Sequence, residues 1–598
     1  MHQSETGARP RTSTLWFTGV ALLASVASQP AWAQGFFPLK DIRPGLHGVG
    51  RTVFEGNRIG EFQVEILGVI ENAAPQQSII LARLSGGPLA ETGILQGMSG
   101  SPVYIDGKLA GAVALGFPYS KEPIAGIQPI EQMIADARFP EAGPQAHSAP
   151  LITLPADSYG PLSQLANLKA PLSLSGFTAS TLAKFAPDLA RFGFAPLQGV
   201  SGGSPKSQSY SGTVEPGSMI TVELMSGDMS VGADGTVTYV NGKHVYAFGH
   251  RFLDAGSTDL PFARAEVLAL LPALNSSFKI STPREWAGTM VSDRSTAIAG
   301  EIGRPAHTVP LTISVRPNNA PAHDYHMQVV NDRLMTSFLT QMALYSSLDA
   351  TERTTGAGTL RLQGRVRFEN SSLPPVDIRD IFISDNATPA QAAANGVVIL
   401  GFVMSSGFPE LQVKDISYDV EASEVKNQVV IDQVWASRTQ AKPGDDIQIT
   451  TLLTGDNGVE LTRQATYRIP IGAQPGPIDF TVSDANTLNY PDFAGLNAAS
   501  LHSPQQLIDV INRFRGSDNV FVRVWKQEPS YNVGAAIPGG DVTDPPPSIA
   551  LILAQPSASA SGSVLVNNTR GAQIAEIAVP VSGYAVSGAK TVQVEVKE

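Results

Sequence analysis

The residues best suited to chemistry lie in GMSGSPVYIDGKLAGAV, residues 97–113, where Ser99 stands among small residues. A serine nucleophile needs an exposed hydroxyl, backbone N–H groups directed at the developing oxyanion, and a base. Gly97 and Gly100 permit the backbone twist that points successive N–H groups to one side. The same pattern is also typical of a Gly/Ser turn without chemistry, because a short motif is only a hypothesis.

A candidate base ends the stretch GTVTYVNGKHVYAFGH, residues 235–250. This residue, His250, can accept the proton of a serine hydroxyl because imidazole titrates close to neutral pH. A histidine at the end of a strand is as readily structural, donating to a backbone carbonyl. His47 is an alternative base, although its setting, GLHGVG, is typical of a turn.

Four stretches resemble the SpoIVB peptidase family, the sporulation-signalling serine peptidases of the chymotrypsin-like clan. Residues 43–70, 92–113 and 125–133 look like the half of that domain that contains the serine. Residues 235–250 resemble the family's segment that ends in Gly-His and supplies the catalytic base.

The resemblance implies that Ser99 is the nucleophile and His250 the general base. It also implies that the N–H groups of Gly97 and Ser99 bind the oxyanion. The order of the halves is reversed, because the histidine half precedes the serine half in the family and follows it here. Such a rearrangement is physically allowed, since domain termini often lie close together and a triad depends on geometry rather than chain order.

The acidic member of the triad is missing from its expected place. The family's acid lies shortly before the serine, and the best-matching position in this chain is Ser85. Asp254 and Asp259 follow His250 closely and are candidates to substitute for it, with Asp254 the preferred one. Glu91 is a further candidate.

Composition excludes several classes of function. The chain has 598 residues, a formal net charge of −12 and no cysteine. Disulfides, thiolate metal sites and cysteine nucleophiles are therefore excluded. No run of lysine or arginine interleaved with aromatic residues is present, so we expect no nucleic-acid partner. We also expect no metal, because His323 and His326, three positions apart on a strand, face opposite sides. We expect no cofactor, because no glycine-rich segment both follows a strand and opens a helix in the phosphate-binding pattern.

The first 33 residues have the form of a signal peptide. Arg9 and Arg11 precede the apolar run 15–26, and Ala31-Trp32-Ala33 fits the small-x-small cleavage rule. The run is too short to span a bilayer comfortably, and an N-terminal anchor is the alternative. We therefore expect an exported protein, periplasmic or secreted, with no membrane span after removal of the signal.

The remaining chain is predicted to be mainly β, because short alternating strands and tight turns dominate it. We expect chymotrypsin-like β-barrel peptidase-type halves and a C-terminal β-sandwich-like region with a few helices. The predicted divisions are a serine half over 34–140, a linker with short helices over 141–212, a second β-rich region with the Gly-His segment over 213–428, and a β-sandwich-like accessory region over 429–598.

Four local elements are predicted with defined ends. Asp106-Gly107 and Asn241-Gly242 are expected to form hairpin turns. A helix is expected over 178–193, kinked or split at Pro187. Another is expected over 503–514, opened by a capping box with proline at its first helical position.

The sequence therefore predicts an exported serine peptidase of the SpoIVB type. The reaction would be hydrolysis of peptide bonds through an acyl-enzyme, and the resemblance implies that the substrates are one or few proteins, or the protein itself. The rival hypothesis is a catalytically inactive pseudo-peptidase that acts as an envelope protein-binding module. The missing acid and the reversed order of the halves favour the rival.

Overall fold

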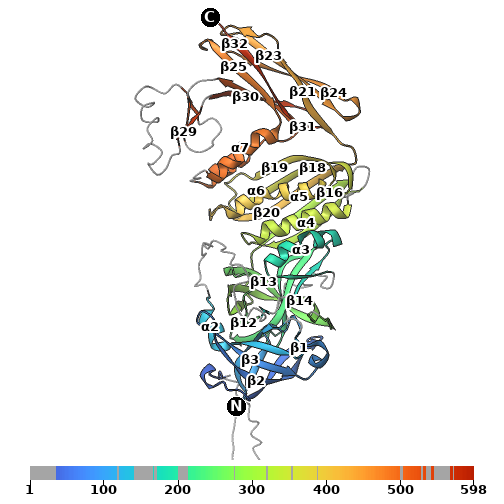
Figure 1. Ribbon diagram of the computed structural model, residues 1–598, viewed down its shortest axis with the longest axis vertical. Helices are drawn as coiled ribbons and strands as arrows, with labels where there is room; N and C mark the ends of the chain where they lie inside the picture. The colour runs from blue at the N-terminus through green and yellow to red at the C-terminus, as the bar shows by residue number, and fades with distance from the viewer. Residues whose placement is uncertain are drawn as a thin grey trace, which may run out of the picture.

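In the computed structural model the chain is laid out along one long axis, with the amino-terminal sheets at one end and the carboxyl-terminal sheets at the other (Figure 1). The predicted signal peptide lies outside the described residues. The structure describes residues 35–117, 120–139, 166–167, 171–198, 213–274, 276–317, 321–351, 355–386, 388–498, 503–526, 530–533, 541–543, 566–569 and 572–598.

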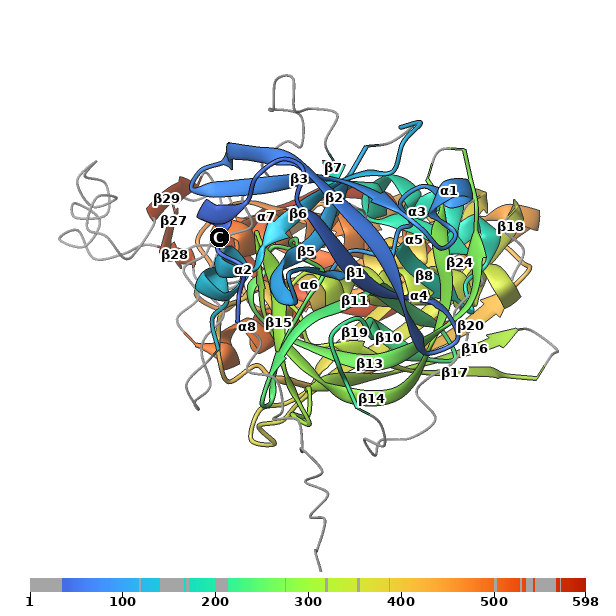
Figure 2. The same cartoon turned by 90° about the horizontal axis from the view of Figure 1, so that it is seen from below.

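The first sheet closes into a six-stranded barrel. The strand order is β4-β1-β2-β3-β6-β5, and an additional pairing of β4 with β5 completes the ring. Figure 2 looks onto this barrel from below. Buried side chains such as Phe62, Ile80 and Ile127 form its core. The elements are η1 (Leu39–Asp41), β1 (His47–Glu55), β2 (Arg58–Ala74), β3 (Gln77–Ser85), α1 (Leu89–Thr92), β4 (Pro102–Ile105), β5 (Lys108–Gly116), β6 (Ile124–Pro129), α2 (Ile130–Asp136) and β7 (Ala166–Asn167), which pairs with β5.

The second sheet contains another closed ring of six strands. Its order is β10-β13-β14-β15-β12-β11, and β10 also pairs with β11. The prediction of a mainly β chain with barrel halves is confirmed. The strands are β10 (Met219–Gly227), β11 (Ser230–Asn241), β12 (His244–Ala247), β13 (Gly256–Leu271), β14 (Phe278–Arg294) and β15 (Ala297–Ile302).

Part of the stretch expected to be a linker extends this second sheet. β8 (Pro171–Ser175) pairs with β11, and β9 (Ala195–Gln198) pairs with β8. Between them α3 (Ala179–Arg191) runs through Pro187 as one helix. Of the two outcomes expected at Pro187, the split is therefore wrong, and the kink stays a prediction. The Thr178 side chain caps its first turn, and apolar side chains including Phe185 pack into the core on either side of the proline. This packing outweighs the hydrogen bond that proline removes.

A layer of strands and helices follows the second barrel and shares its core. One helical stretch here, Thr388–Ser405, is long and apolar enough to cross a membrane, but core helices of soluble proteins pass the same test. Its side chains at Ala392, Leu400 and Val403 are buried in this core. The elements are β16 (Thr308–Pro317), β17 (His323–Val330), α4 (Met335–Thr351), β18 (Thr355–Phe368), β19 (Val376–Asn386), α5 (Thr388–Gly396), α6 (Val398–Ser405) and β20 (Val413–Ser423).

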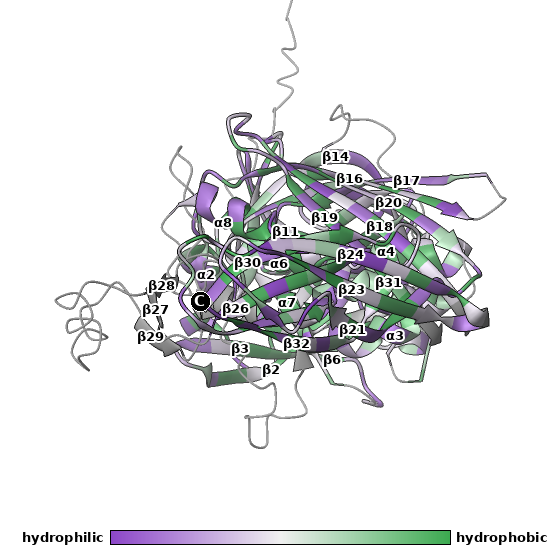
Figure 3. Ribbon diagram, turned by 90° about the horizontal axis from the view of Figure 1, so that it is seen from above, coloured by the Kyte–Doolittle hydropathy of each residue, from purple (hydrophilic) through white to green (hydrophobic). Residues whose placement is uncertain are grey.

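The carboxyl-terminal region packs a four-stranded and a five-stranded sheet around a core of its own. Hydrophobic and hydrophilic residues alternate along its strands (Figure 3), as in β24, because one face of each sheet is buried. A three-stranded sheet of β27, β28 and β29 stands beside it. The elements are β21 (Gln428–Ala436), β22 (Gln440–Ala441), β23 (Asp446–Gly455), η3 (Asp456–Gly458), β24 (Glu460–Arg468), β25 (Gly476–Ser483), α7 (Ala485–Ala498), α8 (Pro504–Ile511), β26 (Asn519–Lys526), β27 (Ser530–Val533), β28 (Asp541–Thr543), β29 (Val566–Thr569), β30 (Ala572–Pro580), β31 (Ala585–Ser587) and β32 (Ala589–Val596).

The local predictions have mixed outcomes. Asp106 and Gly107 both have positive φ, +49° and +74°, as a type I′ hairpin turn requires. The second hairpin turn is shifted by one residue, because Asn241 still pairs with His244 and the loop residues are therefore 242–243. The predicted cap of the last helix is confirmed, since the Ser503 side chain accepts a hydrogen bond from the N–H of residue 506.

Candidate active site

Ser99 lies in a tight turn between α1 and β4 of the first barrel. Met98 is fully buried, and its carbonyl accepts a hydrogen bond of 2.9 Å from the N–H of Ser101, so the turn is anchored in the barrel core. Gly97 and Gly100 have φ values of +91° and +92°. L side chains rarely adopt this conformation, which explains the two glycines that flank the serine.

The turn docks directly on β11 of the second barrel. The N–H of Thr236 donates to the Ser99 carbonyl at 2.8 Å, and the Thr236 hydroxyl donates to the Gly97 carbonyl at 2.9 Å. The Thr238 hydroxyl donates to the Gly100 carbonyl at 2.7 Å. A Cβ added at Gly100 would lie 1.9 Å from the Thr236 carbonyl oxygen, so only glycine fits this contact.

The segment that ends in His250 lies beside the same turn. A Cβ added at Gly100 would also lie 2.5 Å from the backbone nitrogen of Phe248. A Cβ added at Gly249 would lie 3.1 Å from Cβ of Ala112 on β5. The contact between the two barrels therefore brings the serine turn and the Gly-His segment together, although Ser99 and His250 lie 151 positions apart in the chain.

His250 follows a strained turn at the end of β12. The N–H of Gly249 donates to the Ala247 carbonyl at 2.9 Å, and Phe248 between them has a φ of +69°. A γ-turn of this hand is rare, and such strain is concentrated at functional sites. His250 is buried, and its Nδ1 lies 2.6 Å from the Arg251 carbonyl oxygen. Because a carbonyl only accepts, Nδ1 carries the proton of the neutral ring, and Nε2 is left as the basic nitrogen.

Asp293, at the end of β14, holds the loop that follows His250. Its carboxylate accepts hydrogen bonds from the N–H groups of Phe252 at 2.8 Å, Leu253 at 2.6 Å and Ala255 at 3.3 Å. Burial raises the pKa of Asp293 to about 6, and these backbone donors oppose the rise. Sequence reasoning missed this acid, because Asp293 stands between Ser292 and Arg294, where a carboxylate gives no local signal of its role.

The acids that the sequence favoured have other partners. The Asp254 carboxylate is largely exposed and forms an ion pair of 3.0 Å with Nη1 of Arg251. The Asp259 carboxylate accepts from the backbone N–H of His307 at 3.0 Å and lies 2.9 Å from its Nδ1.

The remaining candidates lie on the first barrel and are exposed. Ser85 is the last residue of β3, and Glu91 lies in the short helix α1. His47 begins β1 and pairs with Glu65 on β2, so its setting is a strand rather than the expected turn.

The Ser99 turn leaves its donors available. Neither the N–H of Gly97 nor that of Ser99 donates a hydrogen bond to another group in the part of the chain that the structure describes. The Ser99 hydroxyl is buried, and it too has no hydrogen-bond partner among those residues. An oxyanion site needs N–H groups that are not already used in the fold, and these two meet that requirement.

A buried chain of hydrogen bonds supports the turn from beneath. Nζ of Lys279, on β14, donates to the Thr52 hydroxyl at 2.7 Å, which lies 3.4 Å from the Thr236 hydroxyl. Thr236 in turn donates to the Gly97 carbonyl, so the chain ends on the candidate oxyanion turn. Burial lowers the pKa of Lys279 to about 7, and the charge of Asp234 opposes this shift.

Asp234, on β11, is fully buried among hydroxyl groups. It accepts hydrogen bonds from Thr221, Ser173 and Ser281. Burial raises its pKa to about 6, while these hydroxyls and the charge of Lys279 lower it. Lys279 and Asp234 are a second pair of groups that sequence reasoning missed, because nothing in the neighbouring residues marks either one as buried.

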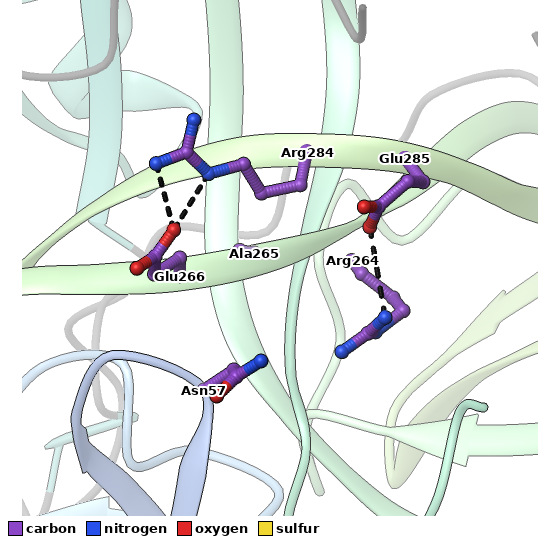
Figure 4. Close-up of a pocket in the computed structure, with 6 residues that line it drawn as sticks. All are labelled: Asn57, Arg264, Ala265, Glu266, Arg284 and Glu285. Carbon is purple, nitrogen blue, oxygen red and sulfur yellow. Dashed lines mark hydrogen bonds and ion pairs between the residues drawn. The ribbon is translucent and has the colours of Figure 1, made fainter. Parts of the chain in front are cut away.

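A small pocket of about 140 Å³ opens between the first barrel and the long hairpin of β13 and β14. Figure 4 shows Asn57 at its edge and two ion pairs that cross the hairpin, Glu266 with Arg284 and Arg264 with Glu285. The charges neutralise each other, so the pocket has no strong preference for an anion or a cation.

Metal ligation has no support among the described residues, where no group of three or more histidine or acidic side chains could hold an ion. The expectation of a metal-free, cofactor-free site stays a prediction.

Comparison with known proteins gives a match in the serine half. No curated protein and no solved structure matches the chain. One family model does match, and it covers the whole of the first barrel, including the serine turn, but not the Gly-His segment. The resemblance read from the serine-containing stretches is thereby confirmed, and residues 39–134 match the family SpoIVB peptidase S55.

Proposed function

We propose that the protein is an exported serine peptidase with Ser99 as nucleophile and His250 as general base. The observation that carries the proposal is the docking of the Ser99 turn on β11 and beside Gly249, with Nδ1 of His250 held by the Arg251 carbonyl. A SpoIVB-type serine half supports the same chemistry.

The reaction would begin with attack of the Ser99 hydroxyl oxygen on a peptide carbonyl carbon. The hydroxyl proton passes to Nε2 of His250, and the N–H groups of Gly97 and Ser99 bind the oxyanion. The tetrahedral intermediate collapses to an ester on Ser99, and His250 returns the proton to the leaving amine. Water then attacks the ester with His250 again as base, which releases the carboxylic acid and restores the serine.

A carbonyl in place of the carboxylate at Nδ1 has an energetic consequence. A carbonyl dipole fixes the tautomer of His250 but stabilises the imidazolium less than a full negative charge does. We therefore expect slow turnover, which suits an enzyme that cuts one or few protein substrates rather than a digestive peptidase.

Covalent labelling with a fluorophosphonate, read by mass spectrometry after long incubation, tests the proposal. We expect a phosphonyl adduct on Ser99 in the mature protein and none in Ser99→Ala or His250→Ala. Ser101→Ala is the matched control, because Ser101 is also buried in the same turn and its hydroxyl has no role in the proposal. A folded protein that is never labelled would contradict the proposal and favour the pseudo-peptidase binding module.

Export is proposed from the signal-like amino terminus. The form found outside the cytoplasm should begin at Gln34, which sequencing of its amino terminus would test. A protein that keeps Met1 and stays in the membrane would point to the anchor instead.

A further inference from the structure

One edge of β5 carries the serine turn. β6 pairs with the opposite edge of β5, whereas β4 covers the near edge only as far as Ala112. Beyond that point the Val113 carbonyl accepts from the N–H of Gly100 at 2.7 Å, and the Val113 N–H donates to the Ser101 carbonyl at 3.0 Å. Residues that follow Val113 on this edge therefore lie next to the turn that holds Ser99.

The next two positions on that edge are occupied by β7. Leu115 pairs with Asn167 and Gly116 with Ala166, in antiparallel orientation. β7 lies on the side of β5 away from β6, which is the side of the serine turn. Since the pairing is antiparallel, the direction from Ala166 to Asn167 leads toward Val113.

This geometry is the one that a peptide substrate needs. An extended peptide added to a sheet edge is held by main-chain hydrogen bonds. A peptide bound here in the direction of β7 would bring the carboxyl side of its main chain toward Ser99. The N–H groups of Gly97 and Ser99 could then bind its carbonyl oxygen. Ser99 itself has no exposed surface.

We propose that β7 is an intramolecular occupant that excludes extended peptide substrates from the edge of β5, so that the protein is autoinhibited. This inference rests on the proposed function of Ser99. The occupant is β7, whose residues Asn167 and Ala166 pair with Leu115 and Gly116 of β5. Release of this strand opens the edge to an extended peptide from another protein.

The first test uses the full mature chain with Ala166→Pro and Asn167→Pro together. Proline donates no backbone hydrogen bond and is excluded from ladder positions, so β7 should leave β5. We expect fluorophosphonate labelling of Ser99 to accelerate by at least about tenfold, because a larger fraction of molecules has an open site. Ser148→Pro, in the proline-rich stretch before β7, should leave the rate unchanged. Equal rates in the wild type and the double variant would overturn the proposal.

The second test needs no catalysis and so separates this proposal from the proposed function. A fluorescent peptide with the sequence of residues 161–170 is titrated against Ser99→Ala chains with and without the two prolines. We expect binding only to the chain whose β7 is released. Binding to neither chain, or equal binding to both, would overturn the proposal that β7 occupies this edge. If the peptide binds as expected but Ser99 is labelled in none of the chains, the result would support the peptide site on β5 and reject the proposed activation of Ser99.

Discussion

At the scale of single residues, the site is organised by one backbone carbonyl and one buried acid. The Arg251 carbonyl fixes the ring of His250, and Asp293 gathers the N–H groups of the residues that follow. Asp293 therefore acts on His250 through the shape of a loop, as a positioning residue. Asp254, closer in sequence, is largely exposed and paired with a surface arginine.

Asp293→Asn should slow the labelling of Ser99 by about 10- to 100-fold, because the amide keeps only one acceptor oxygen for the three loop N–H groups. The rates are measured with the fluorophosphonate at pH 7.5. Asp254→Asn is the control and should stay within about twofold of the wild type, since an exposed ion pair contributes little. Slow labelling of Ser99 in Asp254→Asn, together with a wild-type labelling rate in Asp293→Asn, would assign the positioning role to Asp254 instead.

Glu223, on β10, makes stability depend on pH. Burial raises its pKa to about 8 from 4.5, so its contribution to stability is complete below pH 4.5 and is lost as the pH rises through 8. Glu223→Gln should remove this loss, which is on the order of 4 kcal/mol. Urea unfolding at pH 5, 7 and 9 checks the difference between the wild type and the variant. Glu215→Gln, at an exposed position, is the control, and its free energy of unfolding should depend on pH as in the wild type. The same pH dependence in Glu223→Gln as in the wild type would contradict the prediction.

At the level of the structural elements, the serine turn lies in the contact between the two barrels. Its carbonyls accept hydrogen bonds from β11, and its glycines let the two backbones approach closely. The turn is thus held by the first barrel, through Val113, and by the second barrel, through Thr236. Any change that separates the barrels should separate Ser99 from His250.

Gly100→Ala should abolish labelling of Ser99 and destabilise the protein by about 3 kcal/mol or more, because its Cβ would meet the Thr236 carbonyl. Gly107→Ala is the matched control, since Gly107 also has positive φ but nothing lies within 4 Å of an added Cβ. Gly107→Ala should destabilise the protein by only about 1 kcal/mol, and Ser99 should still be labelled in this variant. Urea unfolding and labelling are measured on both, and a labelled, stable Gly100→Ala would contradict the docking.

At the level of the whole molecule, the described residues form separate hydrophobic cores, and the first barrel has one of its own. The second barrel and the helical layer share one core, whereas the carboxyl-terminal sheets have a separate one. The second barrel is therefore joined to the layer of strands and helices that follows it more closely than to the carboxyl-terminal sheets. Damage to the latter should leave the candidate site intact.

Phe480→Ala and Phe262→Ala test this division, because both side chains are fully buried, one in each core. Each should cost about 3–5 kcal/mol in its own core. We expect Phe480→Ala to lower one thermal transition and leave the labelling rate of Ser99 unchanged at 25 °C. Phe262→Ala, in the second barrel, should reduce labelling strongly. Loss of labelling in Phe480→Ala would show that the carboxyl-terminal sheets support the site.

The local features of this protein can be predicted from its amino-acid sequence. Alternating apolar residues set the strands, Asp106-Gly107 set a hairpin, and the small residues around Ser99 set a tight turn, since each depends only on neighbours in the chain. Which distant groups meet is a property of the folded chain. Asp293 comes to the loop after His250, Lys279 to the Gly97 turn and β7 to the edge of β5 because closed barrels bring together strands far apart in sequence. No local pattern records such contacts, as they follow from the order in which strands pair.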